Sequence, residues 1–189
     1  MSLDRIRLAS LHDKVISAEQ AAAFIKDGMT VGMSGFTRAG EAKAVPLALV
    51  KQAQANPLKI TLITGASLGN DLDKQLTEAG VLARRMPFQV DNTLRKAINK
   101  GEVMFIDQHL SETVEQMRNL QLKKPDVAVI EAVAITEDGG IIPTTSVGNS
   151  ASFAIFAKEV IVEINTNLSP AFEGLHDIYI PSYRPTRQP

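Results

Sequence analysis

The feature of this sequence that most constrains its fold is a repeated alternation of short apolar runs with amphipathic stretches. The run at residues 126–133 is almost continuously apolar, which is typical of a parallel strand that is buried on both faces. The other runs predicted to be strands are residues 29–33, 59–64, 81–84, 103–106 and 160–164. Helices are predicted between them at residues 18–27, 42–54, 71–79, 91–99, 111–122 and 148–158, and a hairpin or irregular excursion at residues 136–145. This alternation predicts an α/β domain in which helices flank a mostly parallel sheet.

The balance of charge excludes two classes of partner. The 189 residues carry 20 basic and 21 acidic side chains, for a net charge of -1, so neither nucleic acid nor an anionic membrane surface is an expected partner. No apolar run approaches the roughly 18–20 residues that a membrane-spanning helix needs. The N-terminus has no apolar signal region, and its acids Asp4 and Asp13 are not typical of a transit peptide. We therefore expect a cytoplasmic protein.

The absence of cysteine narrows the chemistry that this chain can perform. It excludes disulfides, thiolate nucleophiles and cysteine-ligated metal centres. His12, His109 and His176 show no ligand-like spacing, so we predict no metal site. A nucleophile would have to be a serine or a carboxylate, and no GxSxG elbow is present.

Three turns rich in small residues follow predicted strands, at residues 34–37, 65–67 and 145–149. In open α/β sheets, ligands bind outside the carboxyl ends of the strands, and glycine lets backbone N–H groups approach a ligand closely. Each turn taken alone is more simply explained as a tight strand-to-helix connection. No phosphate-binding GxxxxGK[ST] motif is present and no GxGxxG follows a strand, which disfavours the usual kinds of nucleotide binding.

The candidate acids and bases have both functional and structural interpretations. Glu131 lies inside an apolar strand, where an unpaired carboxylate is costly. It is either a functional group or, as we favour, a structural one that pairs with a buried arginine or points into a subunit interface. His109 follows a strand and suits a catalytic base, but capping of the next helix is the favoured interpretation. His176 and Asp177 are also interpreted as structural.

Five strings together carry a family resemblance. They occur in this order along the chain: Val31–Thr37, Leu62–Ser67, Ile130–Gly140, Thr145–Ser150 and Gly174–Ile180. The set resembles the acetyl-CoA hydrolase/transferase family, in particular bacterial succinyl-CoA:acetate CoA-transferases, from Arg5 to Arg187. The resemblance implies a CoA-transferase-like α/β domain. Family members are considerably longer and consist of two related α/β halves, so this chain corresponds to the N-terminal half only.

The resemblance also implies a mechanism. Family members transfer coenzyme A between short-chain acyl-CoA and carboxylates such as acetate and succinate, through a glutamyl-CoA thioester on a glutamate of the C-terminal half. No glutamate here matches that motif, so we expect no catalytic residue in this chain and no activity from it alone. The acyl-CoA thioester is expected as a substrate, with no permanently bound cofactor. The expected partners are acyl-CoA, small carboxylates, the C-terminal half and, at full length, a second copy in a homodimer.

Two other functions stay open at this point. An acetyl-CoA hydrolase uses the same glutamate but lets water intercept the thioester. A non-catalytic binding or regulatory module would keep the fold without the chemistry. The domain is expected to span residues 1–165, and the proline-rich residues 166–189 are interpreted as a linker to an absent C-terminal domain, as in an N-terminal fragment or a truncated form.

The resemblance assigns substrate-binding positions to this chain. The serine of the family's Gly-Ala-Ser turn lies near the acyl and carboxylate pocket, and here it is Ser67, with Gly65 beginning the turn. Gly35 and Phe36 are expected to face the same cleft.

A neighbouring pocket loop of the family can read Pro-Phe-Asn-Thr and corresponds to residues 87–90. Gln89 and Val90 depart from that version. Val90 lacks the hydroxyl and makes the expected pocket less polar, which leaves the preferred carboxylate open.

Overall fold

The computed structural model describes residues 3–69 and 71–180, and these contain one seven-stranded sheet with the order β4-β3-β2-β1-β5-β6, in which β7 also pairs with β5. The strands are β1 Thr30–Met33, β2 Ile60–Thr64, β3 Leu82–Met86, β4 Met104–Phe105, β5 Val127–Ile135, β6 Ile141–Pro143 and β7 Glu159–Ile164. Every pairing is parallel except that of β6 with β5. The predicted mostly parallel sheet is therefore confirmed.

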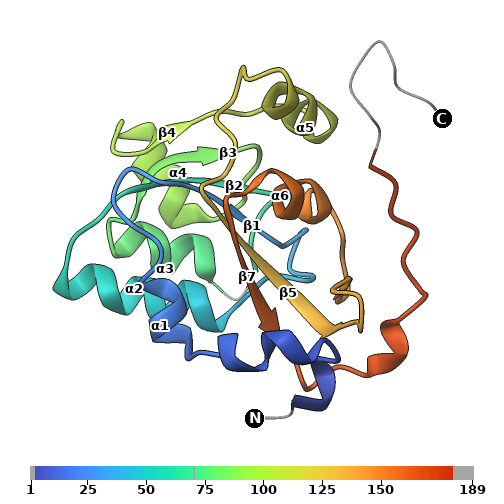
Figure 1. The fold of residues 1–189 in the computed structure, drawn as a ribbon. Helices are drawn as coiled ribbons and strands as arrows, with labels where there is room; N and C mark the ends of the chain where they lie inside the picture. The colour runs from blue at the N-terminus through green and yellow to red at the C-terminus, as the bar shows by residue number, and fades with distance from the viewer. Residues whose placement is uncertain (1–2, 70, 181–189) are drawn as a thin grey trace.

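Helices cover both faces of this sheet (Figure 1). They are α1 Ala18–Ala22, α2 Ala44–Ala55, α3 Leu72–Glu78, α4 Asn92–Asn99, α5 Leu110–Arg118 and α6 Ser150–Phe156, and the short 3-10 helices are η1 Leu3–Arg5, η2 Ala9–Lys14 and η3 Pro170–Phe172. Apolar residues of α1 to α4 form one core cluster with one face of the strands, and residues of α5 and α6 form a second cluster with the opposite face. The fold is thus a three-layer α/β/α domain, as predicted.

The position of strand β5 between two helical layers explains why its sequence is apolar on both faces. All nine of its residues are buried. Val127 and Val129 belong to the cluster beneath α1 to α4, whereas Ala128 and Ile130 belong to the cluster that contains Phe153 of α6. Because alternate residues of a strand point to opposite faces, a strand between two helical layers needs apolar side chains at every position.

Two helices are shorter than predicted. The helix expected at residues 18–27 ends at Ala22, because the N–H groups of Phe24 and Ile25 bond to carbonyls three residues back and tighten the last turn. This places Ile25 in the core and leaves Phe24 half-exposed. The helix expected at residues 111–122 ends at Arg118, because Leu120 adopts a φ of 58° and reverses the chain.

The other predicted strands and helices differ from the observed ones by two residues or fewer at either end. The excursion predicted at residues 136–145 is a hairpin, in which β6 runs antiparallel to β5. Gly139 has a φ of 88° in the turn between them, a conformation that glycine adopts without steric cost.

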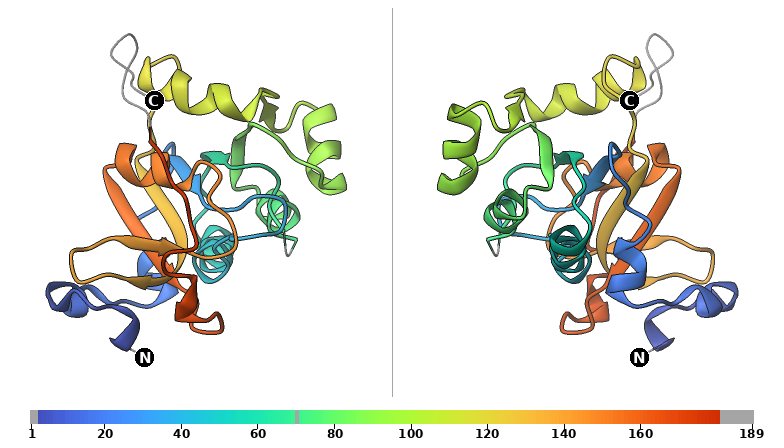
Figure 2. Two further views of the ribbon diagram at one scale, coloured as in Figure 1. Left: turned by 90° about the vertical axis from the view of Figure 1, so that its right-hand side faces the viewer. Right: turned by 90° about the vertical axis from the view of Figure 1, so that its left-hand side faces the viewer.

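The described N- and C-terminal segments pack against each other at one end of the molecule (Figure 2). The guanidinium of Arg5 donates to the carbonyl of Val133 at 3.1 Å and to that of Leu168 at 2.9 Å. Leu168 and Phe172 pack against a small apolar cluster that includes residues of β5 and β6. Beyond η3, the described chain runs along the outside of the domain (Figure 1). Residues 181–189 of the expected linker lie outside the described residues.

Candidate functional site

The three turns rich in small residues meet at the carboxyl edge of the sheet. A Cβ atom on Gly65 would lie 2.6 Å from the carbonyl oxygen of Gly35 and 3.5 Å from Cα of Gly148. The backbone N–H of Thr37 also donates to the carbonyl of Ser67 at 3.1 Å. The first two turns follow the parallel strands β1 and β2, and the third follows β6, which runs antiparallel to β5 and returns the chain to the same edge. The site is therefore assembled by the strand order rather than by one contiguous motif.

Ser67 is the most unusual residue of this edge. It is 1% exposed, and its hydroxyl has no hydrogen-bond partner among the described residues. Two other buried side-chain atoms also lack a hydrogen-bond partner among the described residues. They are Nδ2 of Asn149, in the third turn, and Oε1 of Gln89, in the loop after β3. A buried polar group without a partner costs about 1–3 kcal/mol. Unpaired buried polar groups are rare in proteins, so each of these three calls for an explanation, of which a functional role is one.

Apolar side chains border the same edge. Phe36 follows β1 and is 44% exposed, and Val90 lies in the loop after β3 and is 49% exposed. Strand β2 separates β1 from β3, so the segments that carry Phe36 and Val90 follow the two strands that flank β2, which leads into the turn of Ser67. Of the sequence-predicted residues, Gly35, Gly65 and Ser67 are held in contacting turns and Val90 lies at the same edge of the sheet.

A buried ion pair that the sequence reasoning missed lies beneath the Ser67 turn. Arg85 of β3 and Asp73 of α3 are joined by a contact of 2.9 Å between Nε and Oδ1, and both side chains are buried. A sequence signal exists in the two adjacent arginines of a predicted strand, Arg84 and Arg85. Alternate strand residues face opposite sides of a sheet, so the two arginines had to point toward opposite helical layers.

Glu131 is structural, as favoured, but its partner is a lysine rather than an arginine. Its carboxylate lies 2.6 Å from Nζ of Lys43 and accepts a hydrogen bond of 2.9 Å from the amide of Asn165. The hydroxyl of Thr144 donates to the other carboxylate oxygen. Its backbone N–H donates to Oγ of Ser34 at 2.9 Å, which anchors the first turn of the site. Both oxygens of Glu131 are engaged, which fits a structural group.

The two candidate histidines are also structural. His109 is the N-cap of α5, where its Nδ1 accepts from the backbone N–H of Ser111 and lies 2.7 Å from the Ser111 hydroxyl. Nε2 of His176 lies 2.7 Å from the carbonyl oxygen of Thr144, and its ring stacks on Phe172. Capping of the next helix, the favoured interpretation of His109, is confirmed.

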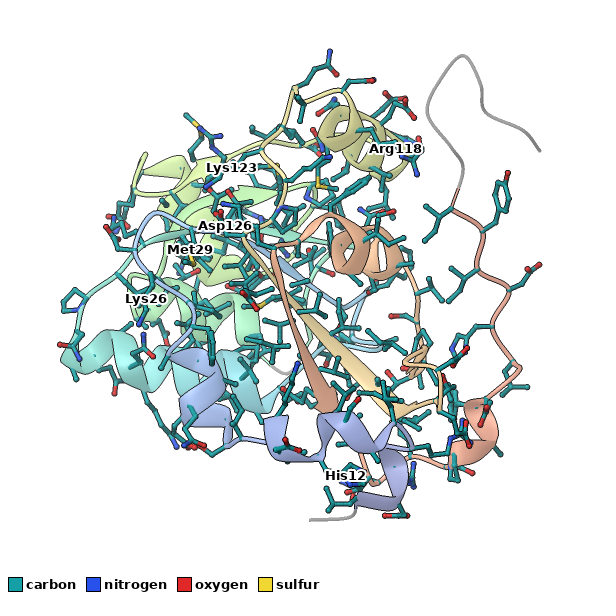
Figure 3. All side chains as sticks on the ribbon, in the orientation of Figure 1. His12, Lys26, Met29, Arg118, Lys123 and Asp126 are labelled. Carbon is teal, nitrogen blue, oxygen red and sulfur yellow. The ribbon has the colours of Figure 1, made fainter. Side chains whose placement is uncertain are left out.

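A separate cavity of about 570 Å³ opens at the amino edge of the sheet. Phe24, Lys26, Met29 and Asp126 are among the residues that line it, and Figure 3 shows three of them on one side of the domain. Asp126 accepts hydrogen bonds from the backbone N–H of Thr30 and from two lysines. Burial raises the pKa of Asp126, but these hydrogen bonds outweigh it and lower the pKa to about 2.

The described residues lack two further features that would indicate a function. No group of three or more metal-ligating side chains is placed to hold a metal ion in residues 3–69 and 71–180. Over the same residues, no helix has the length and apolar character that crossing a membrane requires.

Comparison with known proteins identifies relatives along nearly the whole chain. Residues 2–186 match the family model of the acetyl-CoA hydrolase/transferase N-terminal domain. The chain is 45% identical over 187 residues to succinyl-CoA:acetate CoA-transferase of Clostridium kluyveri, covering 98% of this chain and 35% of that protein. It is 42% identical over 197 residues to acetyl-CoA hydrolase of Kluyveromyces lactis, covering 98% of this chain and 37% of that protein. The chain therefore spans about a third of the length of these relatives.

Solved structures share the fold at low identity. Glutaconate coenzyme A-transferase from Acidaminococcus fermentans superposes with a TM-score of 0.64 at 17% identity, and the match covers 79% of this chain and 68% of that one. This likeness supports the three-layer architecture.

Proposed function

Because this chain belongs to the acetyl-CoA hydrolase/transferase family, as its N-terminal domain, we propose that it builds part of the carboxylate pocket of a CoA-transferase. The full-length enzyme, in which this domain is joined to a C-terminal half, would transfer coenzyme A between short-chain acyl-CoA and carboxylates such as acetate and succinate. The observation that carries this proposal is the buried, unpartnered hydroxyl of Ser67 among three contacting turns.

Each pocket residue has a distinct role in this proposal. The hydroxyl of Ser67 donates a hydrogen bond to the substrate carboxylate, and a bond to a charged acceptor is worth about 1.5–3 kcal/mol. The side-chain N–H of Asn149 is a second donor. Gly35 and Gly65 let the turns approach closely enough to bring these donors together. Phe36 and Val90 contribute the apolar border that suits a short alkyl chain.

The nucleophile is a glutamate of the C-terminal half. Its carboxylate attacks the thioester carbonyl, the C–S bond breaks, and coenzyme A departs as a thiolate, which produces an acyl-glutamyl anhydride. The thiolate then attacks the glutamyl carbonyl, which gives the glutamyl-CoA thioester and releases the first carboxylate. The acceptor carboxylate runs these steps in reverse, so the kinetics are ping-pong, and hydrogen-bond donors stabilise each oxyanion.

Support for a nucleophile outside this chain comes from two strand glutamates. Both oxygens of Glu131 are engaged by neighbouring side chains, and both oxygens of Glu163 accept backbone N–H groups. The 189-residue chain alone is expected to show no turnover with acetyl-CoA and succinate.

Acetyl-CoA hydrolysis is the second candidate, because the Kluyveromyces lactis relative bears that name. The full-length enzyme with acetyl-CoA and succinate separates the two. Succinyl-CoA as the product supports transfer, whereas free thiol formed without an acceptor supports hydrolysis. If neither product appears, the chain is a binding module and the proposal is wrong.

Ser67→Ala tests the pocket itself. We expect the KM for the acceptor carboxylate to rise at least about tenfold, since about 1.4 kcal/mol corresponds to a factor of ten. The KM for acyl-CoA should stay unchanged. The matched control is Ser152→Ala, another buried serine that lies in α6, which should leave both constants unchanged.

A further inference from the structure

The guanidinium of Arg85 contacts the backbone on both sides of the candidate site. Its side chain is fully buried. Nη2 donates to the carbonyl of Ala66 at 3.0 Å, directly before Ser67. Nη1 donates to the carbonyl of Met86 at 2.6 Å, directly before the loop at residues 87–90. One rigid planar group therefore sets the spacing between the two segments that carry the predicted pocket residues.

Asp73 completes this arrangement from the helix side. Its Oδ1 accepts from Nε of Arg85 at 2.9 Å, and its Oδ2 accepts from Nη2 at 3.2 Å. Oδ2 also accepts from the backbone N–H of Leu68 at 3.2 Å. The residue before Ser67 is thus held by the arginine and the residue after it by the aspartate. Thr64 donates its hydroxyl to the same Ala66 carbonyl.

The energetics argue that this pair serves geometry rather than stability. Burying two charges costs several kcal/mol per ion, and replacing a buried ion pair with apolar residues of similar volume is often neutral or stabilising. Arg85 donates four hydrogen bonds, two to the carboxylate of Asp73 and two to backbone carbonyls at the edge of the site. Arginine is suited to such a task because its donors form a fixed fork, whereas lysine offers one flexible point charge.

We propose that Arg85 and Asp73 are positioning residues for carboxylate binding, which fix the Ser67 hydroxyl relative to the loop at residues 87–90. The inference rests on the proposed function of Ser67. Neither residue touches the substrate in this arrangement, and both act through the peptide groups that flank the serine.

The first test measures backbone protection in the 189-residue chain. In hydrogen–deuterium exchange followed by mass spectrometry, Arg85→Lys should accelerate exchange in peptides over residues 64–69 and 86–90 at least about tenfold. Peptides over α2 should keep their wild-type rates. Arg84→Lys is the matched control, because it makes the same substitution at the adjacent strand position, where Nε donates to the sulfur of the exposed Met104. It should leave both site peptides unchanged.

The second test is a double-mutant cycle in the full-length enzyme. Arg85→Lys should raise the KM for the acceptor carboxylate about tenfold and change the KM for acyl-CoA by less than about twofold. In the Ser67→Ala background, Arg85→Lys should add less than about a further twofold, because the hydroxyl that it positions is already gone. Asp73→Asn should behave in the same way as Arg85→Lys.

The outcomes separate this inference from the proposed function. If the effects of Ser67→Ala and Arg85→Lys multiply, the pair does not act through Ser67 and the inference is overturned while the pocket stands. If Ser67→Ala leaves the carboxylate KM unchanged, the proposed pocket fails, and the exchange experiment still reports whether the pair fixes the two segments. If neither Arg85→Lys nor Asp73→Asn folds, the pair is a stability element and the inference is wrong.

Discussion

Lys43 and Glu131 form an ion pair of 2.6 Å in which only the lysine reaches solvent, with its side chain 41% exposed against 2% for the glutamate. The pair joins the start of α2 to the central strand. Removing one partner of such a pair leaves a buried charge uncompensated.

Lys43→Met should therefore lower the free energy of unfolding by about 2 kcal/mol, less than for a fully buried pair because the lysine is partly solvated. Urea denaturation measures this change. Adding Glu131→Gln should recover most of the loss. Lys100→Met, which breaks an exposed pair with Glu102, should cost less than about 0.5 kcal/mol. Equal losses for Lys43→Met and Lys100→Met would contradict the assignment.

Glu163 caps α2 from a distant strand. Its carboxylate accepts the backbone N–H groups of Lys43, Ala44 and Val45 at 2.7 to 3.0 Å. Glu163→Gln should lower the free energy of unfolding by about 1–2 kcal/mol, because charge-assisted bonds at a helix N-terminus are lost. Glu159→Gln, an exposed position on the same strand, serves as the control and should stay within about 0.5 kcal/mol of wild type.

Asp126 predicts a pH dependence of stability. Its pKa is lowered from 3.8 to about 2, so its contribution is present above about pH 4 and is lost as the pH falls toward 2. The shift corresponds to roughly 2 kcal/mol. Asp126→Asn should lose roughly this amount at neutral pH and show a flatter profile of unfolding free energy between about pH 4 and 2. Parallel profiles for the two proteins would show that another carboxylate is responsible.

Ser67→Ala should not destabilise the 189-residue chain. Its hydroxyl is buried without a partner, so the free energy of unfolding should stay constant or rise by up to about 1 kcal/mol. Ser34→Ala is the contrasting variant, since Ser34 is equally buried but accepts the N–H of Glu131. It should cost about 1–3 kcal/mol. A loss for Ser67→Ala as large as that for Ser34→Ala would mean that the hydroxyl has a structural partner.

Gly65→Ala tests the close approach of the turns. The new methyl group would lie 2.6 Å from the Gly35 carbonyl oxygen, which is backbone and cannot rotate away. We expect a loss above about 2 kcal/mol in thermal or urea unfolding. Gly101→Ala introduces a methyl group into open space at a φ of 76°, and only the cost of about 1–2 kcal/mol for a left-handed residue applies. The contact explanation fails if Gly101→Ala is the more destabilised variant.

The layers of the fold and the meeting of the first two turns were predictable because both follow from parallel strands. An apolar run such as residues 126–133 requires cover on two faces, and the carboxyl ends of parallel strands share one edge. That edge holds Gly35 and Gly65 together, and Gly148 reaches it because β6 runs antiparallel to β5. The hydroxyl of Ser67 could be placed there, but its lack of a partner depends on three-dimensional packing.

The remaining features depend on spatial pairing that no local pattern encodes. The end of α5 is set by a leucine in the left-handed conformation, where glycine is the usual signal. The expectation that Glu131 pairs with an arginine was wrong, since its partner Lys43 lies 88 residues away and no local pattern links the two. The buried member of Arg84 and Arg85 is fixed only once the sheet register is known.

The capping of α2 by Glu163 also bears on how the chain is synthesised. The donor N–H groups leave the ribosome about 120 residues before the carboxylate that accepts them. Chains are synthesised from the N-terminus at about 5–20 residues per second. The carboxylate that caps α2 is therefore synthesised at least several seconds after the helix itself. A nascent chain that stalls before Glu163 contains the residues of α1 to α4 but lacks the carboxylate that caps the N-terminus of α2.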